Sequence, residues 1–194
     1  MDKTREDGWN LVCEYIQSES LRKHCLAVET AMRAYAEHFG EDPERWGLVG
    51  LIHDFDYELH PTLDQHPQEG VPILRERGFP QDVIDDALSH ADHLSMPRDT
   101  SIRKTIFAVD ELTGFISAVA LVRPSKAVAD VTPASVKKKM KDKAFARAVD
   151  RAAMLEGAEL LGVPFDEHVA FVIEAMAGNA CALGLAGIAT DDAP

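Results

Sequence analysis

The sequence lacks the features that mark disulfide-rich, secreted and membrane-spanning proteins. It has three cysteines, an odd number without CxxC or ladder spacing, and Cys25 is expected to be a small buried apolar residue of a helix. The first residues, MDKTREDGW, hold no apolar run of the signal-peptide kind, and no stretch of about 18 uncharged apolar residues is present to span a membrane. These absences favour a soluble, cytoplasmic protein without membrane contact.

Basic residues are also scarce. The chain has 20 Lys and Arg against 33 Asp and Glu, which gives a formal net charge of −13. Binding to a nucleic-acid polymer depends on a basic surface that releases counterions, so such a polymer is excluded as the main partner. A small anionic substrate remains compatible, because the local field of a site can oppose the net charge.

Sustained alternation of apolar and polar residues is absent too, whereas apolar residues recur at helical spacing along the whole chain. Helices are expected over 7–17, from residue 18 or 20 to 38, over 43–52, 67–77, 80–90 and 102–122, from Pro133 onward, and from a capping Asp166 to 175. A chain of 194 residues suffices for one domain with a substantial core. We therefore predict an all-α, single-domain helical bundle over residues 1–177, followed by an Ala- and Gly-rich tail over 178–194 that begins as a short helix.

Several ionisable residues stand on helices that are otherwise apolar. His53 and Asp54 directly follow the apolar stretch 48–52, and His24 lies on the core-facing side of its predicted helix. Asp110 is embedded in TIFAVDELTGFISAVALV, the most hydrophobic helix of the chain. Because burying an unpaired carboxylate is costly, these aspartates need a cation. By contrast, His168 is expected at the surface.

Two more histidines complete this set, since His66 precedes a helix opened by proline and His90 ends the next one. Four imidazoles and two carboxylates on separate apolar helices favour one shared metal site over six independent accidents. Imidazole together with carboxylate suits the divalent transition metals Fe, Mn, Zn, Ni and Co.

In chain order these residues read H…HD…H…H…D, and HPQEG stands at 66–70. The series resembles the HD-domain metallohydrolase superfamily over residues 20–120, and HPQEG looks like the HPxxG of its six-ligand, two-metal branch. The resemblance implies a helical bundle and one or two metals, with two favoured. It implies one metal held by His24, His53, Asp54 and Asp110, and a second completed by His66 and His90, with Asp54 as the bridging, catalytic carboxylate.

Two departures from related branches bear on the substrate. The GYP signature of the branch that opens cyclic dinucleotides is absent. Many relatives have Gly-Lys after the His-Asp pair, where this chain has Phe55 and Asp56, so a phosphate-contacting lysine is missing at that place. Asp56 is an acid that could assist proton transfer.

The segment 123–151 concentrates positive charge, with nine basic residues and three acidic ones. On a continuous helix, Lys139, Lys143, Arg147 and Arg151 would share a broad face, because they are spaced by four. This face is either solvated and paired with the many acids of the chain, or an anion clamp for phosphate groups. The candidate substrate-binding cations are Arg123, Lys126, Lys143 and Arg147.

The function predicted from the sequence is a metal-dependent phosphohydrolase that cleaves a nucleotide or another small phosphate ester with a metal-activated water. A di-iron oxygenase of the same family is an alternative, because imidazole and carboxylate ligands serve both chemistries. A nucleotide-binding or signalling module without turnover is another. The intact six-residue series argues against the module.

Overall fold

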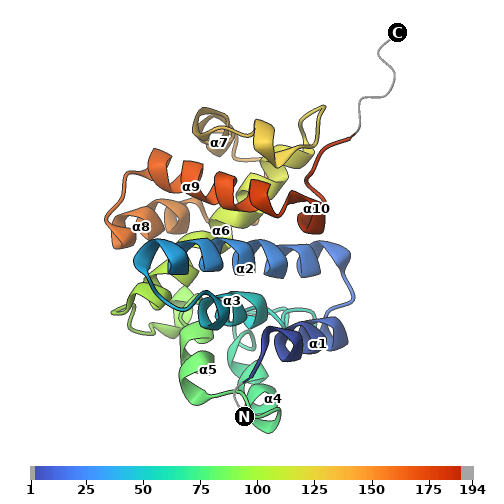
Figure 1. Cartoon of the computed structure of the whole chain (residues 1–194), viewed down its shortest axis with the longest axis vertical. Coiled ribbons are helices and arrows are strands. Elements are labelled where there is room, and N and C mark those ends of the chain that lie inside the picture. Colours follow the sequence, from blue (N-terminus) through green and yellow to red (C-terminus); the bar gives the residue numbers. More distant parts are fainter. Residues whose placement is uncertain (1–2, 189–194) are drawn as a thin grey trace. The chain divides into compact units, whose positions relative to one another are not determined.

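The computed structural model describes residues 3–188, and the secondary structure of these residues is helical (Figure 1). The α-helices are α1 Arg5–Tyr15, α2 Glu19–Phe39, α3 Pro43–Ile52, α4 Val71–Glu76, α5 Gln81–Leu88, α6 Ser101–Leu121, α7 Pro133–Met140, α8 Arg151–Leu161, α9 Phe165–Gly178 and α10 Ala180–Leu183. Three 3₁₀ turns join them: η1 Gln68–Gly70, η2 Asp92–Leu94 and η3 Val128–Asp130. Over residues 3–188 there is no strand, only an isolated bridge between Ala127 and Ala186, so the all-α prediction is confirmed.

The chain forms two compact units, Met1–Phe107 and Ala108–Pro194, and α6 runs through the boundary between them. In the first unit α3 is the central helix, with α1, α2 and α5 packed against it. Its residues from Trp46 to Ile52 are all buried, as expected for a helix that is apolar on every side. The His-Asp pair follows directly at the end of α3, so the packing of this helix fixes where the pair lies.

The boundaries of α2 and α3 agree with their predicted caps. The Ser18 side chain accepts a hydrogen bond from the backbone N–H of Leu21, and Asp42 accepts one from Glu44 with Pro43 at the first helical position. Each cap satisfies a backbone donor that the first turn of a helix leaves without an intrahelical partner. The structure thus selects Ser18 from the two expected starts of α2, and α3 begins at Pro43 as predicted.

In the second unit α9 is the central helix, and it packs against α7, α8, α10 and η3 (Figure 1). His168 lies on its buried face together with Val169 and Val172, with no exposed surface, so the prediction of a surface histidine was wrong. Its Nε2 atom donates a hydrogen bond to the backbone carbonyl of Ala108 on α6, 3.0 Å away. This bond gives the buried Nε2–H group of His168 a hydrogen-bond acceptor, as buried polar groups require.

The basic segment is not one helix. α7 ends at Met140, residues 141–150 form turns, and α8 starts anew at Arg151 with Asp150 as its N-cap. The prediction that Lys139, Lys143, Arg147 and Arg151 share one helical face was therefore wrong. A new helix starts after the turns because the Asp150 side chain accepts hydrogen bonds from the backbone N–H groups of Ala152 and Ala153.

The last helices also differ from their predicted limits. α9 begins one residue before Asp166, which therefore lies within its first turn and does not cap the helix. The Asp166 carboxylate instead forms an ion pair with Lys137, with 2.7 Å between Oδ2 and Nζ. The stretch expected to be a tail begins with α10, and the backbone N–H of Val128 then donates to the carbonyl of Leu185. The remainder of that stretch, 189–194, lies outside the described residues. Within residues 3–188, none of the helices combines the length and apolarity of a membrane span.

Candidate metal centre

Five of the six predicted ligands lie in the first unit, where four segments of the chain deliver them. His24 comes from α2, half-buried, and His53 and Asp54 follow α3. His66 ends the loop after that pair, and His90 follows α5; both rings are buried. Residues separated by up to 66 positions in the sequence are thus presented by elements that pack on or around α3.

The carboxylate of Asp54 is the point on which these rings converge. Its Oδ1 atom lies 3.1 Å from Nε2 of His66, 3.4 Å from Nε2 of His90 and 3.5 Å from Nε2 of His53. Its Oδ2 atom lies 3.7 Å from Nε2 of His24. All four histidines therefore direct the same ring atom, Nε2, toward one buried carboxylate.

These contacts divide into two groups of possible metal ligands that share Asp54. One group consists of His24, His53 and Asp54, and the other of Asp54, His66 and His90; within each group one ligand atom per residue lies within 4.8 Å of the others. Imidazole nitrogen with carboxylate oxygen is a donor set that divalent transition metals accept. Each group has the residue types and the spacing to hold such an ion.

The outer nitrogens of two rings fix which atom is available for a metal. His53 Nδ1 lies 2.8 Å from the carbonyl oxygen of Gly50, and His90 Nδ1 lies 2.7 Å from that of Ala87. A carbonyl oxygen only accepts hydrogen bonds, so Nδ1 must carry the proton in both rings. In the neutral tautomer the Nε2 lone pair of each ring then faces Asp54, which is the form a metal requires.

His66 is held by a carboxylate instead of a carbonyl. Its Nδ1 atom lies 3.0 Å from Oδ1 of Asp56, which has no exposed surface, and its Nε2 atom lies 3.3 Å from Nε2 of His90. Burial disfavours the charged ring and lowers the pKa of His66, but hydrogen bonds and charge from Asp54 and then Asp56 outweigh it and raise the pKa to about 9. The two carboxylates thus favour positive charge at the ring of His66.

Two residues next to these rings received no binding role from the sequence. Asp56 was considered only as a proton carrier, and the structure gives it a fixed partner, His66. The ring of Tyr57 stands edge-on to that of His66, with their centroids 5.1 Å apart, and 44% of Tyr57 is exposed. The spacing of Asp56, two residues after Asp54 in HDFD, was the available signal, but only the fold shows which histidine it meets.

The remaining predicted residues belong to the second unit. Asp110 lies half-buried on α6, and its backbone carbonyl accepts a hydrogen bond from the Thr113 hydroxyl at 2.9 Å. Its role as a ligand stays a prediction. Arg123 is half-buried after α6. Lys126 is exposed, as are the two predicted cations of the turn segment, Lys143 and Arg147.

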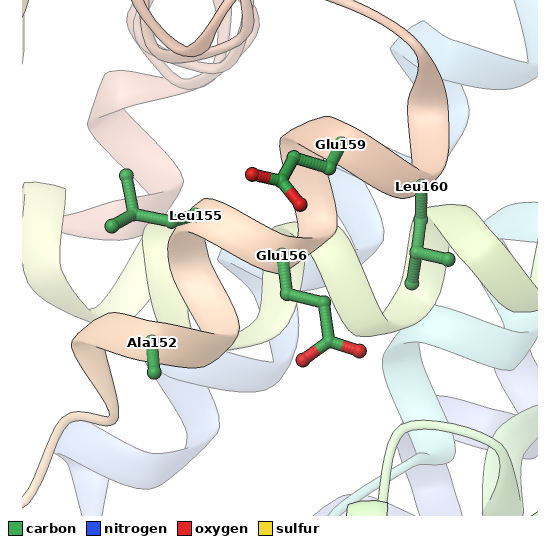
Figure 2. Close-up of a pocket in the computed structure, with 5 residues that line it drawn as sticks. All are labelled: Ala152, Leu155, Glu156, Glu159 and Leu160. Atoms are coloured by element: carbon green, nitrogen blue, oxygen red, sulfur yellow. The ribbon is translucent and has the colours of Figure 1, made fainter.

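A hollow on the second unit is separate from all of these residues. Figure 2 shows that its lining comes from α8 alone, and that the carboxylates of Glu156 and Glu159 project to different sides of the helix. Leu155 stands beside them and is exposed. None of the predicted ligands or cations lines this hollow, so it adds nothing to the metal centre.

Comparison with known proteins agrees with the geometry of the first unit. Searches of curated proteins and of solved structures give no significant match. The family model described as HD domain, however, matches residues 21–152, which is more than half of the chain and includes every residue of both ligand groups. The chain therefore belongs to the HD domain family, an all-α family whose members are generally metal-dependent hydrolases.

Proposed function

We propose that this protein is a metal-dependent phosphohydrolase that acts on a nucleotide or another small phosphate ester. The observation that carries the proposal is the position of Asp54, whose two carboxylate oxygens face different histidines and belong to both ligand groups. A carboxylate shared in this way suits a two-metal site, which would stabilise the attacking and the leaving oxygen of a phosphoryl transfer. Family membership supports hydrolysis as the reaction class.

The residues would divide the work as follows. His24, His53 and Asp54 would hold one metal, with Asp110 as a proposed further ligand, and Asp54, His66 and His90 would hold the other. Metals in such sites lower the pKa of a bound water and offset negative charge that develops on phosphoryl oxygens.

The protein also controls protons near the centre. The proton on Nδ1 of His53 and of His90 is held by a backbone carbonyl, so neither ring is arranged to give that proton to substrate. Tyr57, exposed beside His66, is in a position to meet the organic part of an ester.

The charge of the substrate phosphate calls for cations, and the position after the His-Asp pair supplies none. Phe55 stands there, 2% exposed, with its ring edge-on to Tyr15 at 5.6 Å between centroids. We propose that substrate phosphates are met by basic residues of the segment 123–151. The candidates are Arg123, Lys126, Lys143 and Arg147. Replacing each in turn by Ala should raise KM for a phosphate ester only where the cation contacts substrate.

The test begins with the metal content of protein purified without a chelating column. We expect about two transition metals per chain in the wild type and none in Asp54→Ala, because Asp54 belongs to both ligand groups. The control is Asp64→Ala, which removes an exposed carboxylate from the neighbouring loop and should keep both metals. Phosphate esters are then screened with Mn, Co, Ni and Fe.

Three results would redirect the proposal. Bound iron whose absorbance changes under oxygen, without phosphatase activity, would indicate the oxygenase. Metal-loaded protein that binds nucleotides but turns over neither ester nor oxygen would indicate a signalling module. Wild-type protein that takes up none of the metals offered would overturn the enzymatic function altogether.

A further inference from the structure

The three buried histidines around Asp54 differ in what holds their outer nitrogen. His53 and His90 are bonded through Nδ1 to backbone carbonyls of the helical turn that precedes each of them. His66 is bonded through Nδ1 to a side chain, Asp56. A substitution cannot remove a backbone carbonyl, whereas the partner of Nδ1 in His66 is a side chain that can be replaced.

Asp56 is itself held in one place. It has no exposed surface, and its backbone carbonyl accepts hydrogen bonds from the N–H groups of Leu59 at 2.9 Å and His60 at 2.8 Å. On the side-chain end, a Cβ atom added to Gly70 would lie 2.7 Å from both Cγ and Oδ2 of Asp56. Only glycine therefore fits at position 70 while the carboxylate keeps its place, since real Cβ atoms do not approach this closely.

The second oxygen of Asp56 indicates that this arrangement serves the ring and not general stability. Oδ2 is buried and makes no hydrogen bond to any group within residues 3–188. A buried carboxylate oxygen without a partner is costly, and a neutral side chain would avoid this cost. The compensating interaction is the hydrogen bond that Oδ1 accepts from Nδ1 of His66, which fixes the ring and its tautomer.

We propose that Asp56 is a positioning residue that controls metal binding at the Asp54–His66–His90 site, while the His24–His53–Asp54 site binds its metal without Asp56. This inference rests on the metal site of the proposed function. With Asp56 present, Nδ1 of His66 keeps its proton, so Nε2 is the ring nitrogen that can bind a metal beside Asp54 and His90. An asparagine can turn its NH₂ group toward Nδ1, which favours the tautomer with the proton on Nε2 and blocks the metal.

The experiment is a titration of metal-free protein with Co²⁺, followed by visible absorbance and by elemental analysis after gel filtration. Asp56→Asn is compared with the wild type and with Asp64→Asn, the same substitution at an exposed position of the adjoining loop. We expect two binding steps in the wild type and in Asp64→Asn. In Asp56→Asn one step should weaken by roughly 10–100-fold, while the other keeps its affinity and its spectrum.

Gly70→Ala is a second variant that perturbs the carboxylate from the backbone side and leaves its charge in place. It should weaken the same Co²⁺ step as Asp56→Asn, which keeps the inference testable if Asp56→Asn does not fold. Circular dichroism of each variant checks the helical content.

The outcomes separate this inference from the proposed function. Two unweakened steps in both Asp56→Asn and Gly70→Ala, or equal weakening of both steps, would overturn the role of Asp56 and leave the metal site standing. A single Co²⁺ binding step in the wild type would show that the protein has one metal site, and would overturn the separate role of Asp56 at a second site. No Co²⁺ binding by the wild type would overturn both the inference and the proposed function.

Discussion

His24 and Asp54 meet on the opposite side of the carboxylate from the other histidines: Nε2 of His24 lies 3.7 Å from Oδ2, whereas Nε2 of His66 lies 3.1 Å from Oδ1. His24 therefore belongs to one ligand group and His66 to the other. Substitution of either histidine by Ala should leave one metal place intact, so the protein should keep about one of its two metals, because each place depends on its own ligands.

Elemental analysis of His24→Ala and His66→Ala, beside Asp54→Ala, checks this division. His38→Ala is the control, since this histidine is exposed on the same helix as His24. If His24→Ala and His66→Ala each lost all metal, the two groups would form a single site.

Much of this arrangement could be predicted from the sequence. The caps at Ser18 and Asp42 set the starts of α2 and α3, and the apolar spacing of α3 indicated that the His-Asp pair follows a buried helix. Local rules suffice there, because a cap or an apolar stripe acts within a few residues. The meeting of His24 with Asp54 was expected only from the resemblance, because it depends on how helices pack and not on spacing.

Other features needed the fold. His168 lies four residues before Val172 on the buried stripe of α9, a signal that outweighs its polarity once Ala108 offers a carbonyl. The break at residues 141–150 was missed because regular spacing of lysines resembles a helix face. Charge spacing carries little information about helices, whereas Asp150, whose side chain accepts hydrogen bonds from two backbone N–H groups, marks where α8 begins.

Close packing at Gly157 predicts that its replacement by Ala lowers stability, whereas the same replacement at Gly178 should have little effect. A Cβ atom at Gly157 would lie 2.5 Å from Cα of Ala108, so α8 and α6 would have to move apart. We expect Gly157→Ala to lower the free energy of unfolding by about 1–3 kcal/mol, measured by urea denaturation. Gly178→Ala, at the exposed end of α9 with open space around its Cβ, should change it by less than about 1 kcal/mol. Equal effects at both positions would contradict the close approach.

Burial of His168 predicts a dependence of stability on pH. Burial lowers the pKa of His168 below its ordinary value, and the bond to the Ala108 carbonyl only partly opposes this shift. The unfolded chain therefore binds a proton at higher pH than the folded chain does. Stability contributed by the neutral ring is complete above the unfolded pKa of about 6.5 and is lost as the pH falls toward the lower folded pKa.

Urea denaturation of the wild type and of His168→Gln between pH 7.5 and 5 tests this sign. Gln has no proton to gain in this range, so the free energy of unfolding of the variant should fall less steeply below pH 6.5 than that of the wild type. The histidine at position 38, which is exposed, provides the control variant His38→Gln. A steeper fall in His168→Gln would contradict the buried neutral ring.

The turn segment 141–150 depends on Arg151, whose guanidinium donates hydrogen bonds to the backbone carbonyls of Met140, Asp142, Phe145 and Val149. A planar fork with several donors can serve carbonyls in different directions, which a single ammonium cannot. In Arg151→Lys we therefore expect trypsin to cut the segment at least roughly 10-fold faster, because losing two or more such bonds favours local opening.

Limited digestion with mass analysis of the fragments measures this rate, and Lys143 and Arg147 supply cleavage points inside the segment. Arg123→Lys is the matched control, because it makes the same exchange in the same unit and keeps every trypsin site. If both variants were cut at the wild-type rate, Arg151 would not hold the turn. The positions of Lys143 and Arg147, both proposed to meet substrate phosphate, would then not depend on Arg151.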